Sequence, residues 1–429
     1  MRKKSLDGKA SVPRCVAVSG RHWRFAACVA VALGMVLVTG AEGVRAQRGA
    51  ELVASSARML GDRVKTRVVF EFDREFSFST HYVTQPDRIV IDLPATRFSL
   101  DPASLKGVGL FQDVRYGAMD ADTARIVLTG IKPVRLTSAT VMKNEDGKGY
   151  RLVLEAEATD EKAFRELVAK QSWSRPQDEN PAENASFSAL MDTVKPSTGE
   201  FIIAVDAGHG GIDAGATGAT TATAEKEITL AAARELVERL NRETGVRAFL
   251  TRENDEFLSL SERVNLARKG QANLFVSLHA DMLKQKDIRG ATVYTISDKS
   301  SDRMAADLAQ RENFSDELAG LSLPDGPSDV ADILLDLTRR ETQAFSIEMA
   351  RSVVSSFEGQ VGLINNPHRF AGFRVLQAHD IPSVLLELGF LSNPEDEKLL
   401  LDAGWRKKVA DLLAVAIARY RKTAVAGGG

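Results

Sequence analysis

The chain has 429 residues, of which 44% are hydrophobic and 27% charged, and its formal net charge is −2. This composition is typical of soluble globular domains, and the near-neutral charge argues against a nucleic-acid-binding protein. A chain of this length is too long for one ordinary domain, so we expect two or three.

Residues 1–46 have the features of a cleaved export signal. A basic start precedes an apolar stretch at 25–38, and Val44-Arg45-Ala46 is similar to a signal-peptidase site, which predicts cleavage near Ala46. The stretch is shorter than the roughly 20 residues of a membrane span, although an uncleaved anchor is the alternative. We therefore expect a periplasmic protein that does not span the membrane when mature. Because Cys15 and Cys28 both lie in this signal, a mature chain would bind a metal only through nitrogen and oxygen ligands.

Residues 50–158 are predicted to form a small all-β, sandwich-like domain. Apolar and polar residues alternate through 64–72, 89–93 and 152–158, as expected of strands that bury one face. Turn signals such as Gln85-Pro86-Asp87 separate these strands. The composition then changes at 171–199 to a stretch rich in Pro, Asn and Ser, which predicts a linker between two domains.

Residues 200–422 are predicted to form an α/β domain with a mostly parallel sheet flanked by helices. Short apolar runs at 201–205, 246–250, 274–278 and 384–388 are typical of strands covered on both faces. Helical stripes accompany them, including Trp405, Val409, Leu413 and Tyr420 near the C-terminus. Alternation of strands and helices favours a parallel sheet.

Two histidines directly follow predicted strands of this domain. His209 lies in Val205-Asp206-Ala207-Gly208-His209-Gly210-Gly211, and His279-Ala280-Asp281 follows the run at 274–278. Sites in open α/β sheets form beyond the carboxyl ends of the strands. Either histidine alone could be a hydrogen-bonded structural residue, but the pair predicts a metal site.

Two glutamates are candidates for the same site. Glu225 would supply an oxygen ligand, although acidic residues also favour the first turn of a helix for electrostatic reasons alone. Two imidazoles and one carboxylate form a typical catalytic zinc set that leaves one position for water. Glu387 ends an apolar strand, where a carboxylate is costly to bury without a partner or a role. It could move a proton from water to a leaving amine, and a salt bridge is the alternative.

Four motifs in this order resemble those of the zinc-dependent N-acetylmuramoyl-L-alanine amidases of bacteria. They are Asp206-Ala-Gly-His-Gly-Gly, Glu225-Lys226, Ser277-Leu-His-Ala-Asp281 and Leu386-Glu-Leu-Gly-Phe-Leu-Ser-Asn393. The resemblance implies one Zn²⁺ per chain, bound by His209, Glu225 and His279, with Glu387 as the catalytic carboxylate. Arg263 matches a recurring arginine of the family, whose role would be structural or substrate-positioning.

The same resemblance implies a function in the cell wall. The enzyme would hydrolyse the amide bond between N-acetylmuramic acid and L-alanine in peptidoglycan and split the septal wall during daughter-cell separation. The all-β region resembles the AMIN domain of cell-division amidases, which implies peptidoglycan binding; a spacer role is the alternative. Two other functions stay open: a zinc carboxypeptidase acting on stem peptides, and a non-catalytic peptidoglycan-binding protein.

Residues 300–358, between His279 and Glu387, are predicted to form a helical insert that a minimal catalytic domain would not need. Some members of the family have a similar insert that covers the zinc site with a blocking carboxylate. The resemblance implies that Glu312 is this autoinhibitory group, with Glu317 as the alternative, and that a LytM-domain activator protein relieves the block. Simple helical packing is the other interpretation of the insert.

Overall fold

The computed structural model describes residues 51–101, 105–145, 147–171, 199–321 and 333–427. The predicted signal at 1–46 and residues 172–198 of the predicted linker lie outside these ranges, so both stay predictions. No helix in the described ranges has the length and apolar character that crossing a membrane requires. All contacts described below lie within one structural unit, Glu51–Gly429.

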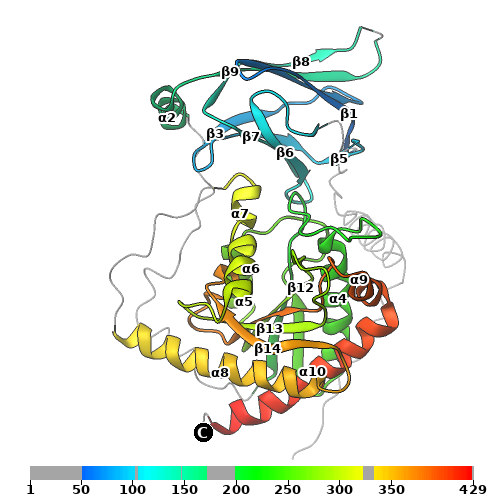
Figure 1. Cartoon of the computed structure of the whole chain (residues 1–429), viewed down its shortest axis with the longest axis vertical. Helices are drawn as coiled ribbons and strands as arrows, with labels where there is room; N and C mark the ends of the chain where they lie inside the picture. Colours follow the sequence, from blue (N-terminus) through cyan, green and yellow to red (C-terminus); the bar gives the residue numbers. More distant parts are fainter. Residues whose placement is uncertain (1–50, 102–104, 146, 172–198, 322–332, 428–429) are drawn as a thin grey trace, which may run out of the picture. The chain divides into compact units, whose positions relative to one another are not determined.

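The first domain is a sandwich of two β-sheets (Figure 1). One sheet has the strand order β5-β1-β2-β9-β8 and consists of β1 (Leu52–Gly61), β2 (Lys65–Phe72), β5 (Thr96–Phe98), β8 (Val134–Lys143) and β9 (Tyr150–Ala158). The other has the order β3-β4-β7-β6 and consists of β3 (Ser79–Val83), β4 (Arg88–Pro94), β6 (Phe111–Ala118) and β7 (Thr123–Gly130). The predicted all-β, sandwich-like domain is confirmed.

The alternation seen in the sequence builds the core of the sandwich. Ile89 and Ile91 of β4 point inward with Ile126 of β7, and they pack against Phe70 and Leu154 of the other sheet. Neighbouring side chains along a strand point to opposite faces, so one face of each sheet supplies this core.

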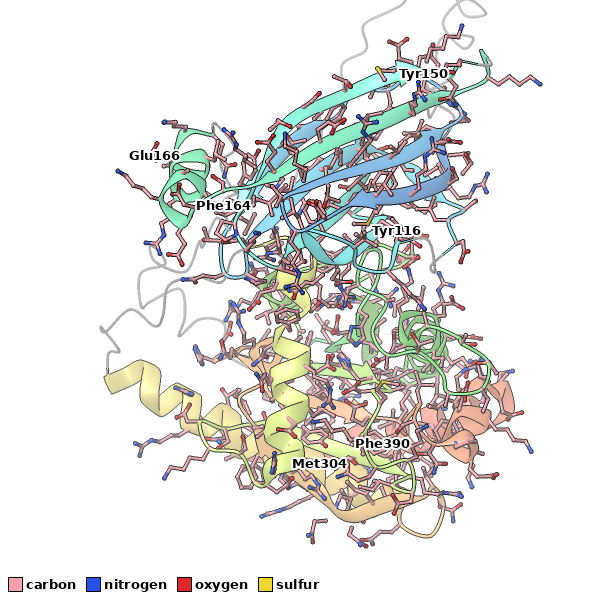
Figure 2. The ribbon with its side chains drawn as sticks, turned by 45° about the horizontal axis from the view of Figure 1, so that its top comes forward. Tyr116, Tyr150, Phe164, Glu166, Met304 and Phe390 are labelled. Carbon is pink, nitrogen blue, oxygen red and sulfur yellow. The ribbon has the colours of Figure 1, made fainter. Side chains whose placement is uncertain are left out.

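A short helix, α2 (Glu161–Lys170), follows the sandwich and was not predicted. The side chain of Asp160 caps it by accepting a hydrogen bond from the Ala163 amide at 2.9 Å. Phe164 is buried and its ring meets Tyr82 edge-on at a centroid distance of 5.6 Å, whereas Glu166 is exposed (Figure 2). This aromatic contact fixes the helix against β3.

The second domain is built on a six-stranded sheet with the order β11-β10-β12-β15-β13-β14. Its strands are β10 (Phe201–Ala207), β11 (Val246–Leu250), β12 (Leu274–His279), β13 (Ala291–Ile296), β14 (Leu363–Ala371) and β15 (Ser383–Glu387). The first four in spatial order are parallel, while β13 runs antiparallel to β15 and parallel to β14. The predicted mostly parallel sheet is confirmed; β13 and β14 are additions that reverse direction.

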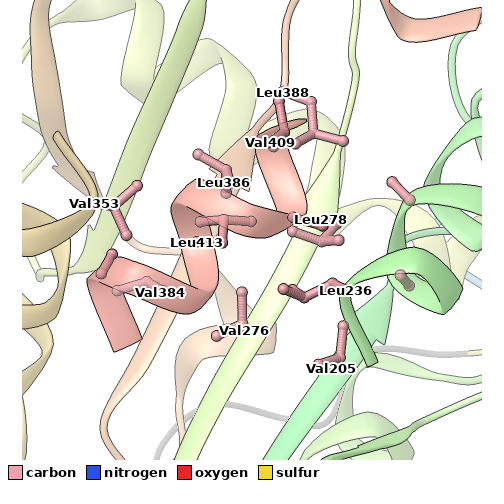
Figure 3. Close-up of a cluster of buried hydrophobic side chains, with 14 of the residues drawn as sticks. Val205, Leu236, Val276, Leu278, Val353, Val384, Leu386, Leu388, Val409 and Leu413 are labelled. Atoms are coloured by element: carbon pink, nitrogen blue, oxygen red, sulfur yellow. The ribbon is translucent and has the colours of Figure 1, made fainter. Parts of the chain in front are cut away.

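Helices cover both faces of this sheet (Figure 1). One face packs against α4 (Glu225–Leu240), α8 (Ile333–Phe357) and α10 (Ala403–Gly427), and α9 (Pro394–Leu401) lies next to α10. Figure 3 shows Val276 and Leu278 of β12 close to Leu236 of α4 and Leu413 of α10. The other face packs against α5 (Leu260–Lys269), α6 (Arg303–Asn313) and the 3-10 turn η3 (Arg374–Leu376). Two apolar layers therefore hold the strand ends rigidly.

The described residues of the segment between β13 and β14 are largely helical, while the predicted bounds of the insert, 300–358, stay a prediction. It contains α6 and α7 (Ser315–Leu318), and α8 follows residues 322–332, which lie outside the described ranges. Phe314 lies between α6 and α7 as the C-cap of the first helix and the N-cap of the second. The first two helices lie at the site described next.

Candidate metal and catalytic site

Three predicted site residues meet because their strands are neighbours. His209 follows β10, His279 ends β12 and Glu387 ends β15, and these three strands are adjacent and parallel. His279 and Glu387 are partners in the strand register. The imidazole rings of His209 and His279 lie 5.0 Å apart between centroids and face each other edge-on. The structure thus brings together the residues that the sequence placed at strand ends.

Glycine at position 208 permits this close approach. A Cβ atom there would lie 2.4 Å from Cε1 of His279, which is shorter than any normal contact. His209 itself has φ 61°, a left-handed conformation that non-glycine residues rarely adopt. The Gly-rich motif therefore shapes the backbone that aims the first imidazole at the second.

Glu225 begins α4 and reaches both imidazoles. It is 0% exposed, with Oε2 lying 3.2 Å from His209 Nε2 and Oε1 lying 3.4 Å from His279 Nδ1. Its oxygens also accept hydrogen bonds from the backbone amides of Ala216 at 2.8 Å and Ala280 at 2.7 Å. These bonds fix the carboxylate between the two histidines.

Glu312, on the last turn of α6, also reaches the imidazoles. Its Oε2 lies 3.1 Å from His279 Nδ1 and 3.5 Å from His209 Nε2. Glu317, on α7, is half-buried and lies beside the charges of Arg88 and Arg374 instead. Of the two carboxylates predicted as the blocking group, Glu312 is the one that lies against the histidines.

The donor set fits a divalent metal. His209 Nε2 and His279 Nδ1 are buried and have no hydrogen-bond partner among the described residues. One ligand atom each of His209, His279 and Glu312 lie within 4.8 Å of one another, and Glu225 faces the same two nitrogens. Four ligands drawn from imidazole nitrogens and carboxylate oxygens are typical of zinc sites.

The electrostatics favour a cation at this point. Burial alone would lower the pKa of His209, but the carboxylates of Asp213, Glu225 and Glu312 outweigh it and raise that pKa well above its usual value. Burial likewise opposes protonation of His279, yet Glu312 and Glu225 raise its pKa to about 10. The carboxylates thus create a strongly negative potential that a divalent ion would neutralise.

The comparison with known proteins agrees with this geometry. Residues 203–419 match the family described as N-acetylmuramoyl-L-alanine amidase, and residues 61–154 match the AMIN domain. The amidase AmiC of Escherichia coli O6:H1 is 30% identical over 83% of this chain and 86% of its own length. This chain belongs to the N-acetylmuramoyl-L-alanine amidases.

Two further relatives match about half of the amidase. AmiA of Escherichia coli K12 is 37% identical over 53% of this chain and 78% of its own length. An N-acetylmuramoyl-L-alanine amidase structure from Clostridium difficile 630 is 20% identical over 52% of this chain and 98% of that chain, with a TM-score of 0.39.

Glu387 of the amidase has one free carboxylate oxygen. The residue is fully buried, and its Oε2 accepts a hydrogen bond from the Asp281 amide at 3.0 Å, whereas Oε1 has no hydrogen-bond partner among the described residues. Burial, reinforced by the carboxylates of Glu225 and Asp281, raises its pKa well above the usual value. A carboxylate can accept and return a proton, and a raised pKa makes it a stronger proton acceptor.

Sequence reasoning missed the partner of His209. Oδ2 of Asp213 lies 2.9 Å from His209 Nδ1. This contact orients the ring so that its other nitrogen, Nε2, faces the candidate metal position. The same oxygen accepts a hydrogen bond from the Ser315 hydroxyl of α7 at 2.5 Å. The available signal was a carboxylate four residues after the histidine in a Gly-rich turn.

A second missed contact connects the insert to the segment after β12. Asp281 Oδ2 pairs with Arg311 of α6, accepting from Nε at 3.0 Å and from Nη2 at 2.7 Å. Arg311, Glu312 and Ser315 therefore each contact a different group around the two imidazoles. The insert therefore packs directly against the candidate site.

Arg263 is buried behind the site of the amidase. Its Nη1 donates to Asp206 Oδ1 and to the Ala207 carbonyl, each at 2.8 Å, and its Nη2 donates to the His209 carbonyl at 2.9 Å. Arg252, which the sequence did not single out, donates to the Ala207 carbonyl at 2.9 Å. The two guanidinium groups brace the backbone that leads into His209.

Proposed function

We propose that the amidase cleaves the bond between N-acetylmuramic acid and L-alanine in peptidoglycan as a zinc-dependent enzyme. His209 Nε2, His279 Nδ1 and Glu225 would hold one Zn²⁺ per chain. One observation carries the proposal. The two buried imidazole nitrogens have no hydrogen-bond partner among the described residues, and they lie next to the carboxylates of Glu225 and Glu312.

Each residue has a definite task in this proposal. When bound, zinc polarises the amide carbonyl and increases the acidity of water. Glu387 accepts the proton of the attacking water on Oε1 and returns it to the amine of L-alanine as that amine leaves. Asp281 orients Glu387 through its backbone amide. Arg263 acts as a structural brace in this scheme, because its contacts are to buried backbone and to Asp206.

The insert keeps the enzyme inactive in the proposed cycle. The Glu312 carboxylate fills the place beside both imidazoles that a water molecule or the substrate carbonyl would need. A LytM-domain activator would withdraw α6 and expose that place. We also propose that the protein acts in the periplasm during daughter-cell separation, with the AMIN domain on peptidoglycan.

Digestion of purified sacculi tests the reaction. The 47–429 protein, supplied with Zn²⁺ and either an activator or the Glu312→Ala substitution, should release intact stem peptides with a free L-alanine amine and leave glycan chains without stem peptides. Release of single amino acids from stem peptides would favour the carboxypeptidase alternative. Zinc binding without any cleavage would favour a non-catalytic peptidoglycan-binding protein.

A further inference from the structure

The sheet β3-β4-β7-β6 is buried on the face that points away from the sandwich core. Ile89 belongs to the core, so its neighbours Arg88 and Val90 point to the opposite face. Nevertheless Arg88 is 2% exposed and Val90 is 0% exposed, and Val83 and Val127 are buried on the same face. An antiparallel sheet with one face on a core commonly presents the other face to water. Another part of the chain therefore covers this surface.

The covering residues come from the catalytic domain and its insert. Val83, Val90 and Val127 pack in one apolar cluster with three residues outside the sandwich, namely Ala319 after α7, Ile212 beside the His209 motif and Phe257 before α5. We call this sheet face, defined by Arg88, Arg125, Val83, Val90 and Val127, the brace surface.

Backbone hydrogen bonds make the contact specific. At the end of β6 the carbonyl of Ala118 accepts from the Ile212 amide at 3.0 Å, and in the turn that follows the carbonyl of Met119 accepts from the Phe257 amide at 2.9 Å. Ile212 lies between His209 and Asp213 in the Gly-rich turn that carries the first imidazole. The sandwich thus touches the loop that carries the first imidazole.

Two arginines of the brace surface bind the end of the insert's second helix. Arg125 Nη1 donates to the Ala319 carbonyl at 2.8 Å, and Arg88 donates to the carbonyls of Glu317 and Leu321. The last carbonyls of a helix lack partners within it, and cations there are favourable. Burying a guanidinium group without hydrogen-bond acceptors is costly, so the two arginines need the insert carbonyls and the carbonyls need the arginines.

The segment after α7 is shaped to lie close to the sheet. Gly320 has φ +79°, and a Cβ atom at this position would lie 2.7 Å from Cγ2 of Val90. A larger residue would therefore both strain the backbone and push the insert away from the brace surface.

The same short segment contacts the metal site at its other end. Glu312 faces the imidazoles, and Ser315 donates to Asp213, only a few residues before Glu317 and Ala319 meet the sandwich. Moving Glu312 away from the histidines would displace the residues held by Arg88 and Arg125. The two contacts are mechanically linked.

We propose that the AMIN sandwich is part of the inhibitory device: its brace surface holds the insert in the position that keeps Glu312 on the metal site. The occupant of this surface is the chain's own segment Glu317 to Leu321. Release of that segment and opening of the site then occur together, so a ligand that separates the sandwich from the insert favours the active enzyme. This inference rests on the proposed block by Glu312.

Charged substitutions on the brace surface test the idea in the full-length protein. Val90→Asp combined with Val127→Asp places charges in the apolar contact, and Gly320→Val perturbs it from the insert side without changing the sandwich. Leu60→Asp is the matched control, because Leu60 lies on β1 of the same domain and is 78% exposed. Circular dichroism and thermal melting establish that each variant is folded.

Two measurements follow on the folded variants: sacculus hydrolysis without an activator, and hydrogen exchange of residues 303–321. We expect both interface variants to increase hydrolysis at least several-fold and to accelerate exchange, and Leu60→Asp to do neither. Added to Glu312→Ala, the interface substitutions should give no further increase, since the block is already absent.

The proposal would be overturned if both folded interface variants hydrolysed sacculi at the wild-type rate while Glu312→Ala was faster. The block by Glu312 would still stand in that case. If Glu312→Ala itself has wild-type activity, the block by Glu312 has failed, and unchanged exchange in residues 303–321 would then overturn the bracing as well. Faster exchange in that case would support the contact between sandwich and insert.

Discussion

Oε2 of Glu312 lies 3.1 Å from Nδ1 of His279, on the side of the imidazole that the metal would occupy. A carboxylate from the helical insert thereby lies against an imidazole that the end of β12 provides. This contact has a direct consequence for basal activity.

Replacing Glu312 with Gln should raise the basal rate of sacculus hydrolysis. The substitution removes the negative charge that pairs with both imidazoles and weakens the closed state relative to the open one. We expect an increase of roughly tenfold, which corresponds to about 1.4 kcal/mol of lost preference for the closed state. Gln310→Ala, at an exposed position of the same helix, is the control and should leave the rate at the wild-type value. Equal rates for both variants would contradict the block.

Metal content should distinguish the ligands from the proton carrier. His209→Ala and His279→Ala should each lose bound zinc and all activity, because each removes one of the two imidazoles. In the Glu312→Ala protein, Glu387→Gln should leave zinc binding unchanged but lower activity by roughly 10²- to 10⁴-fold, the usual contribution of a general acid or base. Elemental analysis and release assays after chelation and zinc return would check this. A Glu387→Gln protein without zinc would reassign Glu387 as a ligand.

Removing the Asp213 carboxylate should weaken metal binding without touching a ligand. Asp213 accepts from His209 Nδ1 at 2.9 Å and so fixes the tautomer that presents Nε2 to the metal. Loss of such a partner typically lowers metal affinity roughly 10- to 100-fold. We expect this for Asp213→Ala in a chelator competition titration, with a smaller loss for Asp213→Asn, which keeps an acceptor. Asp255→Ala, which removes a neighbouring carboxylate that bonds to Gly211 and Lys226, should retain affinity.

The strand-end part of the site could be predicted from the sequence. Carboxyl ends of parallel strands lie at one edge of a sheet, so the sequence placed His209 and His279 at the same edge, and they meet because β10 and β12 are neighbours. Glu387 follows from the same rule, since β15 lies beside β12. The reversal of β13 and β14 was not foreseen, because a short apolar run does not reveal strand direction.

Contacts made by loops and by the insert could not be foreseen in the same way. Asp213 meets His209 only because the Gly-rich turn folds back. Glu312 and Glu317 are five residues apart, so they point to different sides of the insert, and the sequence does not reveal which side meets the histidines. The burial of Val90 and Val127 could not be predicted either, since alternation identifies two faces of a strand but not what covers the second.

Acid should weaken the sandwich through His81. This histidine of β3 is 1% exposed, and burial lowers its pKa to about 4, although the charge of Asp92 partly opposes the shift. In the unfolded chain the imidazole titrates near pH 6.5. Between these two values the unfolded chain binds more protons than the folded one, so the free energy of unfolding falls as the pH falls.

The expected loss between pH 7 and pH 4 is about 3 kcal/mol at most, from the value of 1.36 kcal/mol for each unit of pKa difference. Urea unfolding of the wild type and of His81→Leu at pH 7 and pH 4.5 isolates the contribution, because leucine cannot be protonated. The variant should lose less stability on acidification than the wild type. Val83→Ile, on the same strand face but without an ionisable group, should keep the wild-type pH dependence. An equal pH dependence of unfolding in the wild type, His81→Leu and Val83→Ile would mean that protonation of His81 does not destabilise the sandwich.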